Sequence, residues 1–155
     1  MKKIKVFGLL LCLSTLLSGC TNVIDERGYE DVLLYEKISS IIIGNWEMVR
    51  LGDKEINNTE LLVTLAISAD HKIIYDYKKG EMHEHRESDL HIPYDWHKEQ
   101  DLLVGSIQFY MWGDALSGYD TFKCVLNNDG KEMILIPNDG VAQVDAQAMY
   151  FEKRE

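Results

Sequence analysis

The chain has 155 residues, of which 46% are hydrophobic, and this length and composition fit one globular domain. It carries 26 acidic and 16 basic residues, a formal net charge of −10. Such an acidic chain is a poor partner for nucleic acid and for anionic lipid surfaces, so both classes of partner are excluded.

The N-terminus has the pattern of a secretion signal. Lys2, Lys3 and Lys5 precede a short apolar segment at 6–17 that is interrupted only by small residues, an order typical of signal peptides. The segment is shorter than the roughly 20 apolar residues that a membrane-spanning helix needs. We therefore expect that it is removed rather than retained as a membrane span.

The LSGC sequence at 17–20 resembles the lipobox of bacterial lipoproteins. In that family a diacylglyceryl group is attached to the cysteine sulfur, and a peptidase cuts just before the cysteine. The resemblance implies a signal peptide at 1–19 and a Cys20 that carries fatty acyl chains such as palmitate. The alternative is an ordinary signal peptide with an incidental cysteine.

Acylation at Cys20 predicts a chain that is anchored to the bilayer without spanning it. Two or three acyl chains, each worth about 0.8 kcal/mol per buried methylene, hold a protein durably. The residue after the cysteine is Thr21, and the absence of an aspartate there favours the outer membrane of the bacterial cell envelope. A short tether at 20–28 would keep the domain at 29–155 close to the membrane. Without the signal lysines, 13 basic and 26 acidic residues remain, a net charge near −13.

The cysteines predict no disulfide within this chain. Cys12 leaves with the signal and Cys20 carries lipid, so only Cys124 remains. It lies between Phe122 and Leu126 on the apolar face of an expected strand. We interpret it as a buried, inert thiol.

A helix is predicted at about 29–43. Leu34, Ile38, Ile41 and Ile42 recur at helical spacing on one face. Gly44 is expected to close the helix in the left-handed conformation.

After residue 44 the hydrophobic period changes to alternate residues, which predicts strands. Apolar residues alternate along 61–67, 73–77, 102–112 and 122–126, a hairpin sequence NNDGK occupies 127–131, and strands at 133–136 and 148–153 follow. The predicted fold is mainly all-β: an antiparallel meander of about eight strands, either barrel or sandwich, preceded by one short helix.

Gly44-Asn45-Trp46 resembles the G-x-W motif at the start of the first strand in lipocalins and lipocalin-like lipoproteins. The resemblance implies a barrel with Trp46 packed across its closed end. It also implies a basic side chain from the last strand over the tryptophan, which is either Arg154 or Lys153.

Three aromatic residues and one methionine on the expected inner faces of the strands have two interpretations. Tyr75, Tyr77, Phe109 and Met111 either fill a core or line a ligand cavity. The other two tryptophans are not expected on this inner face. Trp96 lies in a polar, histidine-rich segment, and Trp112 directly follows Met111, so its side chain would point to the opposite face of the strand.

Residues 81–100 hold four of the five histidines. On a strand His83, His85 and Glu87 share one face, and such groups bind transition metals. At about 3.3 Å per residue, the backbone positions of His83 and His85 are roughly 6.6 Å apart, whereas Glu87 is about 13 Å from His83. We therefore expect a solvated, charged hairpin here, with a metal site at His83 and His85 as the alternative.

The sequence contains none of the motifs HExxH, GxSxG, CxxC or a phosphate-binding loop, so we expect no enzyme and no cofactor. Three functions remain: a lipocalin-like module that binds a small apolar ligand, a surface protein with a filled core that binds an envelope partner, and a metal-binding protein. The first is favoured, with the identity of ligand or partner open.

Overall fold

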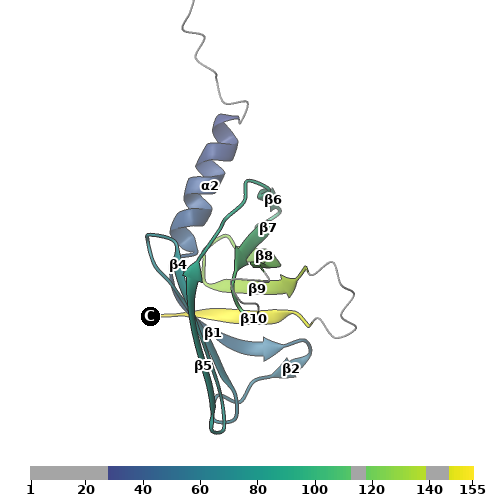
Figure 1. Cartoon of the computed structure of the whole chain (residues 1–155). Coiled ribbons are helices and arrows are strands. Elements are labelled where there is room, and N and C mark those ends of the chain that lie inside the picture. The colour runs from purple at the N-terminus through teal and green to yellow at the C-terminus, as the bar shows by residue number, and fades with distance from the viewer. Residues whose placement is uncertain (1–27, 113–117, 139–146) are drawn as a thin grey trace, which may run out of the picture.

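The structure, a computed structural model, describes residues 28–112, 118–138 and 147–155. One helix stands at one end of a curled, barrel-like antiparallel sheet, and the sheet dominates the fold (Figure 1). The prediction of a mainly β fold with one short helix is therefore confirmed. The predicted signal peptide, Cys12, Cys20 and most of the tether lie outside the described residues.

Helix α2 (Tyr29–Ile41) forms where the sequence predicts it, although it ends two residues earlier. Ile38 and Ile42 are fully buried against the sheet, while residues 30–33 are exposed. The expectation for Gly44 is wrong in detail. The helix is closed by Ile42, whose N–H donates to the carbonyl of Ile38, and Gly44 begins the first strand with φ 137°.

The strands follow one another as a meander. Their bounds are β1 (Gly44–Leu51), β2 (Lys54–Glu55), β3 (Leu62–Ile67), β4 (Lys72–Lys79), β5 (Met82–Asp89), β6 (His97–Glu99), β7 (Leu102–Phe109), β8 (Asp120–Asn127), β9 (Glu132–Pro137) and β10 (Met149–Arg154).

These strands form a single sheet in the order β5–β4–β3–β1–β10–β9–β8–β7–β6, with β2 beside β1. The first and last long strands are neighbours, and a bulge between Met48 and Arg50 bends β1 where it pairs with β10. The two ends of the sheet approach each other where His91, just after β5, forms an isolated bridge with Gln108 of β7. One continuous curled sheet favours the barrel over the sandwich.

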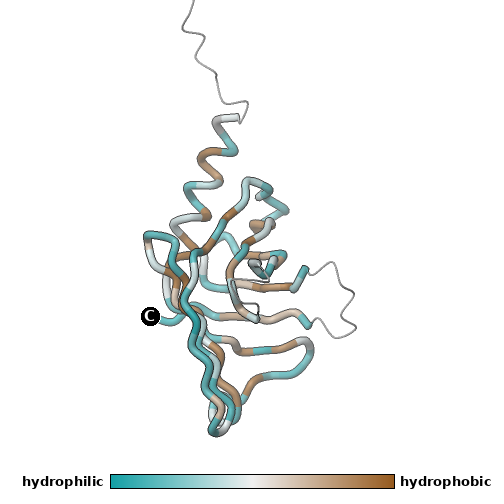
Figure 2. The backbone as a smooth tube through the Cα atoms, in the orientation of Figure 1, coloured by the Kyte–Doolittle hydropathy of each residue, from teal (hydrophilic) through white to brown (hydrophobic). Residues whose placement is uncertain are grey.

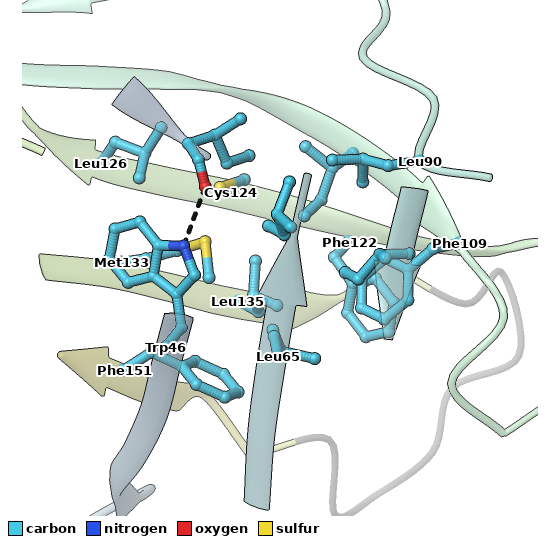
Figure 3. Packing of buried hydrophobic residues seen from close by; sticks show 14 of the residues in the cluster. Trp46, Leu65, Leu90, Phe109, Phe122, Cys124, Leu126, Met133, Leu135 and Phe151 are labelled. Atoms are coloured by element: carbon cyan, nitrogen blue, oxygen red, sulfur yellow. Dashed lines mark hydrogen bonds between the residues drawn. The ribbon is translucent and has the colours of Figure 1, made fainter. Parts of the chain in front are cut away.

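The concave face of the sheet holds the core. Every long strand except β5 buries side chains there, mostly at alternate positions along the strand. Figure 3 shows Leu65, Phe109, Phe122, Leu135 and Phe151 among them. Each contributes apolar area worth about 25 cal/mol per Å² removed from water. The described residues include no buried charged or polar residue, so burial of apolar side chains accounts for the stability of this fold.

The hairpin of β4 and β5 is different, because β5 has no buried residue. Its hydrophilic character is visible as the long teal segment in Figure 2. The expected solvated hairpin is therefore present at 82–89. The chain becomes buried again only at Leu90, directly after β5.

Candidate functional site

The best-defined cluster lies where α2 meets the start of β1. Trp46 is 1% exposed, and its indole N–H donates to the carbonyl of Ile42 over 2.8 Å (Figure 3). The ammonium of Lys153, from β10, lies 5.0 Å from the Trp46 ring centroid and donates to the carbonyl of Ile41 over 2.6 Å. A cation over an indole face is attracted by the ring quadrupole. Helix end, tryptophan and lysine therefore close this end of the sheet.

Gly44 makes room for this arrangement. A Cβ at position 44 would lie 2.7 Å from Cε of Lys153, and the residue has φ 137°. The positive φ favours glycine, and a side chain here would displace the flexible end of Lys153. Partial burial lowers the pKa of Lys153, as expected for an ammonium moved away from water.

The other basic candidate, Arg154, does not contact Trp46. Its guanidinium donates to Glu47 over 3.0 Å and to Glu152 over 3.1 Å. The hydrogen bond with Glu47 raises the pKa of Arg154. Of the two residues that the sequence leaves open, the structure brings Lys153 to the tryptophan.

Trp96 corrects a second expectation. It is 8% exposed and belongs to the same core cluster as Cys124. The indole occupies the space beside Gly105 of β7, where a Cβ would lie only 2.4 Å from ring carbon Cδ2. Gly105 has the same parity as Leu103 and Ile107, so a tryptophan from outside the regular strands replaces the missing side chain in the core. Trp112, in contrast, is 47% exposed.

Polar contacts hold Trp96 in place. The carboxylate of Asp95 accepts the backbone N–H of Ser106 over 3.0 Å and its hydroxyl over 2.6 Å. The indole N–H of Trp96 donates to the carbonyl of Ser106 over 3.1 Å. The sequence pattern did not predict these contacts. The one feature that could have indicated them is Gly105, a glycine among large apolar residues on the inner face of β7.

Cys124 is fully buried, and burial raises the pKa of its thiol strongly. A thiol that resists deprotonation is a poor nucleophile and a poor metal ligand. The predicted burial of this cysteine is therefore confirmed.

His83 and His85 lie on the outer face of the hairpin, where both approach one oxygen of Asp76 from β4. His83 Nε2 is 3.3 Å and His85 Nδ1 is 2.8 Å from that oxygen. These hydrogen bonds outweigh partial desolvation and lower the pKa of Asp76. Among the residues that the structure describes, no three histidine, cysteine or acidic side chains are gathered so that they could hold a metal ion.

Depressions lined by described residues lie on the outside of the sheet. One is bordered by Asn45, Ser68, Asp70, Lys72 and Glu87, and others by the outer side chains of β9 and β10. On the concave face, described side chains, Trp96 among them, are buried in one core cluster.

In the described part of the chain, no helix is long and apolar enough to cross a bilayer. No protein-family model matches the chain, and no curated protein is detectably similar to it.

Proposed function

We propose that this protein is a lipid-anchored lipoprotein of the bacterial cell envelope, held in the outer membrane through acylated Cys20. The LSGC sequence at 17–20, after a charged start and a short apolar segment, supports the proposal. The folded domain begins only a few residues later, at Tyr29. The domain therefore stays close to the membrane surface.

The domain acts as a non-catalytic, lipocalin-like binding module. The observation that carries this proposal is the cluster of Gly44, Trp46 and Lys153, in which a tryptophan on the first strand is covered by a basic side chain of the last strand. This is the arrangement that the G-x-W resemblance implies. In the described residues, the side chains buried on the concave face of the curled sheet are apolar, which suits a small apolar ligand.

A second candidate is an interaction protein with a permanently filled core. It is favoured by the side chains that occupy the concave face and by the acidic exterior. In this case the outer faces and loops hold an envelope partner. The two candidates differ in whether the purified protein retains a small apolar molecule.

The anchor is tested by substitution of the acylated residue. In cells fed a palmitate analogue, we expect that the wild-type chain is labelled and that the Cys20→Ser chain is not, because a hydroxyl is a far poorer nucleophile than a thiolate. Cys124→Ser is the matched control, since that thiol is buried, and it keeps full labelling. Undiminished labelling of Cys20→Ser would contradict the lipid anchor.

A further inference from the structure

Residues 90–96, named the strap here, connect β5 to β6. Leu90, Ile92 and Trp96 of the strap are buried in the core cluster. Tyr94 between them is 62% exposed and stacks on Tyr35 of α2, with ring centroids 4.5 Å apart. An irregular segment thus supplies part of the core that regular strands supply elsewhere.

The strap crosses the place where the sheet is least continuous. Between the end of β5 and β7, the structure has the His91–Gln108 bridge and a hydrogen bond from the Tyr110 N–H to the Ser88 hydroxyl. The neighbouring pair of β7 and β8 is joined along eight residue pairs. Regular strand pairing is therefore interrupted at this seam.

Trp96 lies on the concave side of this seam. Its five-membered ring occupies the space above Gly105, and Gly105 is paired with buried Cys124 of β8. A flat apolar molecule bound on the concave face at this position would meet the same neighbours as the indole. Trp96 is the last residue of the strap, directly before β6, and its indole N–H donates to the carbonyl of Ser106 over 3.1 Å.

We propose that the strap is a gate, and that Trp96 occupies the site of a flat apolar ligand until the strap swings away from β7. The proposal rests on the proposed function, in which the concave face binds a small apolar molecule. The contacts of Asp95 with Ser106 and the stacking of Tyr94 on Tyr35 keep the gate closed. When a binding-competent state is rarely populated, the apparent dissociation constant rises by the inverse of its population. Loosening the strap therefore tightens ligand binding.

The test uses indole, a water-soluble probe with the shape of the displaced side chain, and the purified full chain in detergent. The apparent Kd is obtained from the rise of the thermal midpoint with indole concentration. Asp95→Ala removes both acceptor contacts and Ser106→Ala removes the hydroxyl contact alone. We expect the apparent Kd to fall about tenfold for Asp95→Ala, because lost hydrogen bonds to a charged group raise the open population, and less for Ser106→Ala.

Asn57→Ala is the matched control, because Asn57 also accepts the backbone N–H and the hydroxyl of one residue, Thr59, but in the segment between β2 and β3 and not in the strap. Its apparent Kd should equal that of the wild-type chain. Trp96→Phe provides a second variant that empties part of the site, and it should also bind indole more tightly. Ser106→Ala and Trp96→Phe keep the test decisive if Asp95→Ala does not fold.

The outcomes separate the gate from the function on which it rests. Equal indole affinity in all five proteins would overturn the gate and leave binding on the concave face standing. No binding in any variant, Trp96→Phe included, would overturn both the gate and the apolar ligand. Neither result bears on the lipid anchor, which is tested by labelling at Cys20.

Discussion

At the scale of single residues, the three tryptophans differ in what surrounds each indole. Trp46 is enclosed by the helix end and Lys153, Trp96 covers Gly105, and Trp112 packs against Phe122 while it stays half exposed. Burial and hydrogen bonding of the indole N–H stabilise the first two positions. The third lacks this burial.

These surroundings predict the cost of removing each indole. Trp46→Ala and Trp96→Ala should each lower the free energy of unfolding by about 3–5 kcal/mol, as is typical of buried aromatic truncations. Trp112→Ala should cost less than half of that, since its ring is only partly removed from water. Urea denaturation of the purified chain measures all three. A loss for Trp96→Ala no larger than that for Trp112→Ala would contradict the burial of the strap.

Gly105 provides a second test at this scale. Gly105→Ala should destabilise the chain by about 1–3 kcal/mol, the usual cost of overpacking, because the new methyl would meet the Trp96 ring. Most of this cost should vanish when Trp96 is already alanine, because contacting residues couple. Equal costs in both backgrounds, measured by the same denaturation, would show that the two residues do not touch.

At the scale of elements, the regular strands were predictable and the strap was not. Alternation along β3, β7 and β8 is local, so the sequence indicates both the strand and its buried face. The position of Trp96 depends on a chain reversal that brings residue 96 opposite Gly105. Its polar neighbours Asp95 and His97 suggest exposure, while the cause of its burial, Gly105, lies nine residues away in the sequence. The choice of Lys153 over Arg154 likewise depends on which face β10 turns toward the helix.

The arrangement of the histidines on the hairpin of β4 and β5 leads us to predict that the protein has no stable metal site there. Both imidazoles face the same oxygen of Asp76, and their side chains are 52% and 56% exposed. Purified without a histidine tag, the protein should hold well under one equivalent of zinc, copper or nickel by elemental analysis. One equivalent that disappears in the His83→Ala, His85→Ala double variant would instead establish the metal-binding alternative.

At the scale of the whole molecule, helix α2 and the hairpin of β4 and β5 extend in opposite directions (Figure 1). The helix ends beside Trp46, whose indole N–H donates to the carbonyl of Ile42, and its first residue, Tyr29, is nine residues after Cys20 in the sequence. A lipid on Cys20 would therefore place the closed end toward the membrane and the hairpin toward the aqueous phase. The acidic surface suits this orientation, because it keeps the body of the domain away from anionic headgroups.

Native mass spectrometry of the full chain purified from membranes tests the central claim, a lipid-anchored module for a small apolar ligand, most directly. We predict a mass that corresponds to a chain beginning at Cys20 with two or three acyl groups. We also predict a fraction of molecules that carries one additional small apolar molecule and no metal. A chain that carries no lipid mass, or a lipidated chain that never retains a small molecule, would contradict the anchor or the ligand respectively.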